Sequence, residues 1–188
     1  MIKSNNWLKY MLISCLFIVM SCNGNKSKTI SVEEEMAAAG LTKESDITFD
    51  TEDIASMHAG AKAILEFRYK EQGVDPVASI EMDRWYYQFI ATGSRIEPVQ
   101  DGRWIDFYPD LSYEYGDENG VKGKGKYHYS IMSSILLIVD NDPTVKPNEY
   151  DAKLNGPVLV LVGKPTYKDN HMQMKLQQDY PKEPVNAQ

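Results

Sequence analysis

Apolar residues recur along this chain with two different periods, and the period changes near Met82. Between residues 51 and 72 they recur every three or four positions, as at Met57, Ile64 and Leu65. This spacing predicts one amphipathic helix that lies against another surface. From Met82 onward, apolar and polar residues alternate in short runs, which is typical of half-buried β-strands.

Eight such runs follow one another, separated by turn signals such as Asp101-Gly102 and Asn155-Gly156. The connections are too short for crossover helices, so consecutive strands are expected to be antiparallel neighbours. Eight strands in up-and-down order can close into a small barrel, and closure removes the exposed sheet edges. We therefore expect a mostly β fold, an eight-stranded antiparallel up-and-down barrel, with an open sandwich as the alternative. The expected strands cover residues 84–91, 103–108, 112–115, 124–131, 135–139, 149–154, 158–162 and 171–176.

The first 21 residues have the parts of an export signal. Lys3 and Lys9 supply positive charge ahead of an apolar run at residues 10–20, which is shorter than the roughly 20 residues of a transmembrane helix. The run ends just before Cys22. This arrangement resembles the lipobox of bacterial lipoproteins, in which the leader is removed before a cysteine that carries lipid. A plain secretory signal and an uncleaved anchor are the alternatives.

The composition agrees with an exported, lipid-anchored domain. The chain has two cysteines, and Cys15 lies inside the expected leader, so a disulfide framework is excluded after processing. Lys3 and Lys9 leave with the leader, so 18 of the 20 basic residues remain against 27 acidic ones, a net charge of −9. This acidic surface argues against nucleic acid as a partner. The lipid on Cys22, rather than a basic patch, is expected to hold the protein at the membrane.

These signals divide the chain into five parts. The tether after Cys22 is polar and contains a short helix, because Ser31 and Glu34 match a capping box and Gly40 ends the pattern. The parts are a lipoprotein signal peptide at 1–21, a flexible tether at 22–49, an amphipathic helix and connection at 50–81, a barrel at 82–180, and a C-terminal tail at 181–188.

Short motifs along the strands give a resemblance to a known family. Trp85 lies on the first expected strand, residues 107–113 are similar to an "F-x-x-D-G-x-Y" hairpin, and Gly125-Lys126-Tyr127 is similar to a "G-x-Y" strand start. The chain resembles the lipocalin-like domains of small lipoproteins from Bacteroides-type bacteria over about residues 82–178. Asp83 and Leu111 stand where that pattern has glycine. The resemblance implies a barrel that binds small, mostly apolar molecules.

Aromatic residues are concentrated on alternating strand positions that would share the barrel interior. Two interpretations stay open: these side chains fill a small barrel as its core, or they line a cavity. A cup of tyrosine, tryptophan and methionine with hydroxyls near one mouth would suit a flat or amphipathic ligand. The candidate lining residues are Trp85, Tyr87, Phe89, Tyr113, Tyr115, Tyr127, Tyr129, Met172 and Met174.

Two other motifs are better explained by structure than by chemistry. Residues 120–127 have the spacing of a phosphate-binding loop, but Tyr127 stands where such a loop has serine or threonine, and a strand follows instead of a helix. Asp140-Asn141-Asp142 opens like a calcium loop, but Pro143 breaks the pattern. A basic hairpin and a turn account for them.

The sequence assembles no nucleophile–base pair, cofactor loop or metal-ligand spacing, so we expect a non-enzymatic protein without cofactor or metal. Two functions remain. One is a membrane-anchored barrel that binds a small apolar or amphipathic molecule. The other is an accessory lipoprotein with a filled core that docks on an envelope partner through the helix at 51–72 and its acidic surface. In lipoproteins of Bacteroides-type bacteria, acidic residues directly behind the cysteine favour surface display. None follow Cys22 directly, so a periplasm-facing outer-membrane location is favoured over the cell surface. The three histidines are His58, His128 and His171. One lies on the expected helix and two on different strands, so they do not have the spacing of a zinc site.

Overall fold

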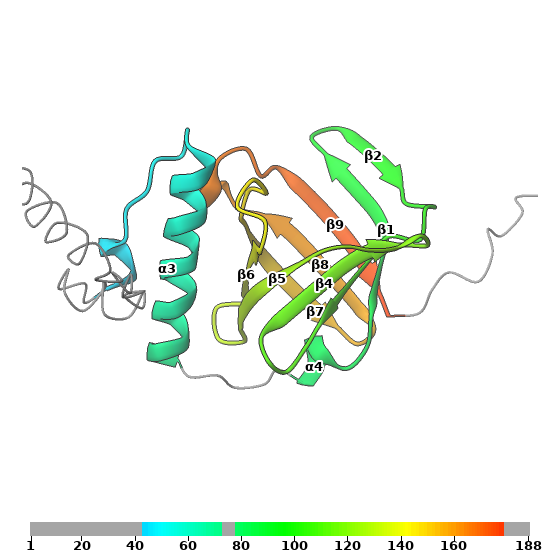
Figure 1. Cartoon of the computed structure of the whole chain (residues 1–188). Coiled ribbons are helices and arrows are strands. Elements are labelled where there is room, and N and C mark those ends of the chain that lie inside the picture. The colour runs from blue at the N-terminus through cyan, green and yellow to red at the C-terminus, as the bar shows by residue number, and fades with distance from the viewer. Residues whose placement is uncertain (1–42, 73–77, 179–188) are drawn as a thin grey trace, which may run out of the picture.

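The strands form a closed antiparallel barrel (Figure 1). The computed structural model describes residues 43–72 and 78–178. Eight strands, β1 and β3 to β9, follow one another around the barrel in chain order, and β1 pairs with β9 to close it. The strands are β1 (Trp85–Thr92), β2 (Arg95–Pro98), β3 (Trp104–Phe107), β4 (Ser112–Asp117), β5 (Gly120–Ser130), β6 (Ile135–Asp140), β7 (Asn148–Asn155), β8 (Val158–Gly163) and β9 (Met172–Gln177).

The expected barrel is confirmed, and each of the eight predicted strands overlaps one of its strands. The structure adds β2, which the sequence did not predict because its four residues are too few to show alternation. Strand β2 pairs with the end of β1, whereas β3 pairs with the beginning of β1 on the same side. The leader, Cys22, the predicted short helix of the tether and the tail at 181–188 lie outside the described residues.

A bulge in β1 changes which side chains face the barrel interior. The pairing of β1 with β9 shifts register between Tyr87, opposite Leu176, and Phe89, opposite Lys175. The extra residue reverses the alternation, since each residue after a bulge moves to the other face. Ile90 therefore packs against the interior, while Phe89 is 44% exposed. The prediction that Phe89 faces the interior is wrong for this reason.

Helix α3 (Ile54–Gln72) lies outside the barrel, along β5 and β6 (Figure 1). Asp53 caps its N-terminus, because the Asp53 carboxylate accepts hydrogen bonds from the backbone N–H groups of Ala55 and Ser56. Its apolar face packs on outward-facing residues of β6 and on the 3₁₀ turn η2 (Pro165–Tyr167), forming a second core. This core contains Met57, Ala61, Ile64, Leu65, Leu137, Val139 and Tyr167.

A buried ion-pair cluster fastens helix α3 to the barrel. Arg68 is 7% exposed and donates hydrogen bonds from Nε and Nη2 to Glu44, which belongs to the 3₁₀ turn η1 (Glu44–Asp46). Nη2 also donates to Glu149 of β7 at 2.7 Å. The second carboxylate oxygen of Glu149 accepts a 2.6 Å hydrogen bond from the hydroxyl of Thr166. The cluster therefore joins three separate segments around one guanidinium.

A short helix, α4 (Ala78–Glu81), closes one end of the barrel, which we call the lower end (Figure 1). Ile80 is fully buried there, and its carbonyl accepts a 2.8 Å hydrogen bond from Nε1 of Trp85. The hydroxyl of Tyr127 donates to Glu81 at 2.6 Å. Phe107 packs edge-on against Tyr127, with ring centroids 4.8 Å apart. The lower half of the barrel is thus a filled aromatic and aliphatic core.

Lowering the pH from 7 to 4 is expected to destabilise the fold through His128. This residue faces outward on β5, is 5% exposed and lies beside Tyr69 of helix α3. Burial, helped by the charge of Arg68, lowers the pKa of His128 to about 4. The unfolded chain binds this proton near pH 6.5, so between about pH 6.5 and 4 it holds more protons than the folded chain. Stability is therefore present above this window and is lost as the pH falls through it.

Urea unfolding at pH 7, 6, 5 and 4 measures this dependence, and the variant His128→Gln should flatten it. Carboxylates such as Asp110, whose pKa is lowered chiefly by hydrogen bonds from Ser112, contribute only at the acid end of this window, and they are the same in both proteins. An equal slope in the wild type and the variant would rule His128 out as the source.

Candidate functional site

The upper end of the barrel, opposite α4, differs from the filled lower end. There β1, β6 and β8 finish at Thr92, Asp140 and Gly163, and β9 begins at Met172. Four tyrosines from three strands converge below this opening. We call Tyr87 (β1), Tyr113 and Tyr115 (β4), and Tyr150 (β7) the tyrosine cluster. All four pack in or against the barrel core.

Two glycines of β5 make room for the cluster. Gly123 and Gly125 pair with Tyr115 and Tyr113 across β4 and β5. A Cβ atom on Gly125 would lie 2.7 Å from Cε1 of Tyr113, and one on Gly123 would overlap the hydroxyl end of the Tyr115 ring. Both tyrosine rings therefore lie in the space that a side chain on β5 would otherwise fill. The rings also stack on each other, with centroids 6.1 Å apart and planes 21° apart.

The phenol groups of the cluster lie close enough to influence one another. Burial raises the pKa of Tyr87 to about 12. Burial also raises the pKa of Tyr113, and Asp140 and the three other phenols raise it further. Burial and the neighbouring Tyr87 raise the pKa of Tyr150, and a hydrogen bond with the Asn170 side chain offsets part of this rise. All four hydroxyls therefore stay protonated at neutral pH and are available as hydrogen-bond donors and acceptors.

The cluster borders accessible space inside the barrel. The hydroxyls of Tyr87 and Tyr113 form no hydrogen bond with any residue that the structure describes. Some described polar atoms have no partner and are also closed off from solvent, but these two hydroxyls do not belong to that group. Each hydroxyl therefore borders space that a water molecule can enter. Tyr87 is only partly buried although it lies in the middle of β1. The upper half of the barrel is therefore less completely filled than the lower half.

Two buried polar side chains lie at the rim of this space. Asp140 is 4% exposed and follows Leu136 and Ile138 on the inward face of β6. Asn170 is 2% exposed, and its Oδ1 occupies the position where a Cβ on Gly163 would lie. Oδ2 of Asp140 and Oδ1 of Asn170 have no hydrogen-bond partner in the described part of the chain. Both unsatisfied atoms are acceptors.

Asp140 lies next to the outermost member of the cluster. Burial raises the pKa of Tyr115, and the Asp140 carboxylate raises it further through its charge and through a hydrogen bond with the Tyr115 hydroxyl. Oδ1 of Asp140 accepts a 2.8 Å hydrogen bond from the backbone N–H of Asp142, which fixes the side chain. The predicted turn at residues 140–142 is therefore present, and its first carboxylate also belongs to the barrel rim.

The structure separates the predicted lining residues into three groups. Tyr87, Tyr113 and Tyr115 belong to the tyrosine cluster. The exposed Phe89 lies on the outer surface, and Met172 is partly buried at the start of β9. The remaining predicted residues pack in or against the core: Trp85, Tyr127, Tyr129 and Met174.

Sequence reasoning missed Tyr150, Asp140 and Asn170 as site residues. Tyr150 shares the inward face of β7 with Ala152 and Leu154, so alternation along the predicted strand at 149–154 could have identified it. Asp140 has the same parity as Leu136 and Ile138. Asn170 lies in a loop before β9, where no periodic signal exists.

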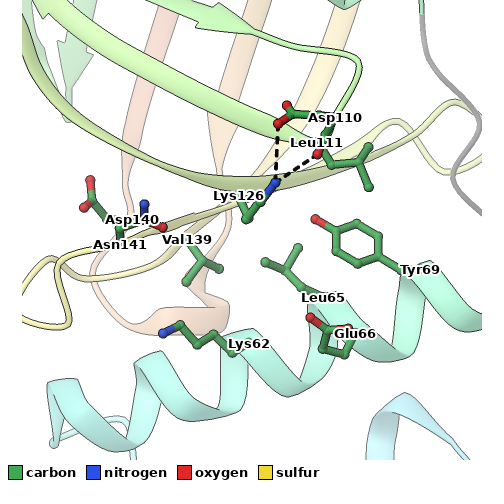
Figure 2. Close-up of a pocket in the computed structure, with 10 residues that line it drawn as sticks. All are labelled: Lys62, Leu65, Glu66, Tyr69, Asp110, Leu111, Lys126, Val139, Asp140 and Asn141. Atoms are coloured by element: carbon green, nitrogen blue, oxygen red, sulfur yellow. Dashed lines mark hydrogen bonds and ion pairs between the residues drawn. The ribbon is translucent and has the colours of Figure 1, made fainter. Parts of the chain in front are cut away.

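A second hollow, of about 200 Å³, lies between helix α3 and the barrel (Figure 2). Leu65 and Tyr69 of the helix form an apolar floor together with Leu111 and Val139. Figure 2 shows that Val139 points toward the helix, whereas the Asp140 carboxylate points away from it. The hydroxyl of Tyr69 already donates to the carbonyl of Tyr127 at 2.6 Å. Lys126 likewise donates to the carbonyl of Asp110 at 2.9 Å, so this hollow offers few unused polar groups.

A third hollow, of about 500 Å³, lies on the outer face of the barrel beside Arg84 and Trp104. The Arg84 guanidinium lies 3.8 Å from the centre of the Trp104 ring and pairs with Asp106. The charge of Arg84 is therefore already paired with groups of the protein itself. Among the described residues, neither hollow has unsatisfied acceptors like those of Asp140 and Asn170 at the upper end of the barrel.

Within residues 43–72 and 78–178, no group of three or more histidine, cysteine, aspartate or glutamate side chains has the arrangement of a metal site. None of the helices in these ranges is both long and apolar enough to cross a membrane.

Comparison with known proteins gives little beyond the geometry. No protein-family model matches the chain, and no curated protein matches it. Among solved structures, a DUF4847 family protein from Bacteroides vulgatus is similar, with 11% identity and a TM-score of 0.40. The alignment covers 53% of this chain and 94% of that chain.

Proposed function

We propose that this protein is a lipid-anchored, non-enzymatic binding protein that holds a small amphipathic molecule in the upper half of its barrel. Cys22 carries the anchor, and the outer membrane, on its periplasmic side, is the proposed location. The apolar part of the ligand packs on the aromatic rings, and its polar part meets the hydroxyls of the tyrosine cluster.

One observation carries this proposal. The hydroxyls of Tyr87 and Tyr113 lack partners in the described residues and border accessible space. A buried polar group without a partner destabilises a fold, so proteins usually satisfy such groups through hydrogen bonds to protein, water or ligand. In the lower half of the same barrel, the polar groups of Trp85 and Tyr127 instead form hydrogen bonds within the protein. The cluster is thus suited to contacts with a bound molecule.

Native mass spectrometry of the full-length protein, released from lipid nanodiscs, tests the proposal directly. The expected result is a bound small molecule that is retained by the wild type and lost from the double variant Tyr87→Phe/Tyr113→Phe. These changes keep the rings and remove only two hydroxyls. A control, Tyr108→Phe, removes a partly buried hydroxyl outside the cluster. A barrel that carries no molecule and is stabilised by none in a thermal-shift screen would refute the proposal.

The substitution Cys22→Ser is expected to move the protein from the membrane fraction to the soluble fraction of lysed cells. Lipid is the only anchor proposed here, since a cleaved leader leaves no apolar segment before the tether. Cys15→Ser is the matched control and should stay in the membrane fraction, because that residue leaves with the leader. Retention of both variants in the membrane would identify the leader as an uncleaved anchor instead.

A second candidate function is docking on an envelope protein, and strand β2 favours it. All four residues of β2 are exposed, and β2 ends the sheet because it pairs only with β1. Ile96 is 69% exposed, and it lies opposite Ala91 on the same hairpin as the exposed Phe89. Free strand edges bind extended segments of partner proteins. Helix α3 suits this role less well, since its apolar face already packs on the barrel.

Cross-linking from a photoreactive residue placed at Ile96 tests the docking candidate. A discrete envelope protein captured at this position, and not from Lys70 on the exposed side of helix α3, is the expected result. Capture of nothing, or equal capture from both positions, would count against β2 as a docking edge.

A further inference from the structure

The buried carboxylate at the barrel rim indicates what kind of molecule the site takes. Asp140 is 4% exposed, and its Oδ2 has no hydrogen-bond partner among the described residues. It also forms no ion pair with a described lysine, arginine or histidine. Burying a carboxylate without a compensating cation is strongly unfavourable. A cation supplied by a ligand would remove this penalty.

The other unsatisfied group at the rim has the same preference. Oδ1 of Asn170 is a buried acceptor without a partner, while Nδ2 of the same amide donates to the carbonyl of Glu149. This bond fixes the orientation of the amide, so the unpartnered atom is its oxygen. Both unsatisfied atoms are acceptors, so they suit a ligand that donates hydrogen bonds.

The walls of the site favour positive charge as well. The rings of Tyr113 and Tyr115 stack on each other beside Asp140, and Tyr87 and Tyr150 are further neighbours of Tyr113. The face of an aromatic ring attracts cations, and cages of tyrosine rings are a known way of binding organic ammonium groups. Among the described cations, Arg103 acts on Tyr87 through its charge, but it is half-exposed and already pairs with Asp101. Lys124 and Lys126 lie on the outward face of β5 and are exposed.

Building on the proposed function, we infer that the ligand is an amphipathic primary amine whose ammonium group binds Asp140 at the rim of the barrel. Its apolar body extends downward among the rings of the tyrosine cluster. The protein thereby selects a positively charged head group, which a site built only for apolar molecules would not do.

Three probes that share one alkyl chain test this inference: octylamine, 1-octanol and octanoate. Each is titrated into the full-length protein in lipid nanodiscs at pH 7 and followed by intrinsic fluorescence. Octylamine is expected to bind about tenfold or more tightly than octanol, since a hydrogen-bonded charge pair discriminates by at least this factor. Octanoate should bind more weakly than octanol, because its charge has the same sign as that of Asp140.

The variant Asp140→Asn keeps the shape and the Oδ1 acceptor but removes the charge. It should lose the tenfold preference for octylamine over octanol, with both affinities measured on the variant itself. The matched control is Asp142→Asn, which removes an exposed carboxylate two residues away and should leave all three affinities unchanged. Because each variant is measured in the same lipid, partition of the probes into the nanodisc cancels.

The outcomes separate this inference from the proposed function. Equal binding of the three probes would overturn amine selectivity while leaving the binding barrel intact, and binding of none would overturn both. An octylamine preference that survives Asp140→Asn, or that is lost equally in Asp142→Asn, would show that Asp140 does not recognise the ammonium group.

Discussion

Replacing Arg68 with methionine is expected to lower the free energy of unfolding by about 3–5 kcal/mol. The guanidinium bonds to Glu44 and Glu149, and Glu149 is 4% exposed. Removal of Arg68 leaves the Glu149 carboxylate buried without its cation. Burial alone would lower the pKa of Arg68, but the two carboxylates more than offset burial and hold the pKa above its usual value. Urea unfolding at pH 7 measures the change, which corresponds to a fall in melting temperature of roughly 10 °C.

Two further variants show whether the buried partner dominates the effect of Arg68. Glu44→Gln should lower the free energy of unfolding by only about 1 kcal/mol, because the Glu44 side chain is 36% exposed and water can replace its contact. The double variant Arg68→Met/Glu149→Gln should regain much of the lost stability, since it no longer buries an unpaired charge. Equal losses in Arg68→Met and Glu44→Gln would contradict this account.

The barrel was predictable because its signals are local. Alternation, turn residues and short connections identify eight antiparallel strands, and all eight are present. The position of helix α3 was not predictable, because an apolar stripe says only that a helix packs against something. Outward-facing Leu137 and Val139 of β6 decide that it lies outside the barrel. Strand β6 is apolar on both faces, so its sequence does not alternate. The pattern therefore cannot show that one face packs in the barrel and the other against the helix.

Single backbone features limited the prediction of the site. The bulge between Tyr87 and Phe89 cannot be seen in a regular pattern of alternation, and it removes Phe89 from the interior. Leu111 illustrates the opposite case. It stands where the lipocalin-like pattern has glycine, and it adopts a left-handed conformation with φ of 61°. A positive φ is a conformation that favours glycine, so Leu111 has a backbone that glycine adopts more easily.

The candidate site depends on contacts that no short motif encodes. Asp140 joins the tyrosine cluster because the register of β5 and β6 places it opposite Gly125, next to the ring of Tyr113. The sequence showed the inward tyrosines of β4 and the glycines of β5 separately. Only the register shows that each ring lies on a glycine, which is why the spacing Gly123-Lys124-Gly125 was interpreted as a flexible hairpin.

The two glycines of β5 are expected to respond very differently to alanine. In Gly125→Ala, the new methyl group overlaps the carbonyl oxygen of Val139 and lies 2.8 Å from Cα of Asp140, so the two strands must separate. A loss of about 3 kcal/mol or more is expected, since backbone cannot move aside as a side chain can. In Gly123→Ala, the three atoms nearest to the methyl group all belong to the end of the Tyr115 ring, which can rotate away. The loss of stability should then stay below about 1 kcal/mol.

Neither glycine has a left-handed φ, so alanine causes no backbone strain at either position. Both substitutions therefore act only through steric contacts of the new methyl group. Urea unfolding should rank Gly125→Ala far below Gly123→Ala. Gly123→Ala nevertheless displaces the Tyr115 ring from its place beside Asp140, so octylamine should bind this stable variant several-fold more weakly than the wild type. Equal stability of the two variants would contradict the proposed packing of rings on β5. Unchanged octylamine binding by Gly123→Ala would show that Tyr115 does not form part of the site.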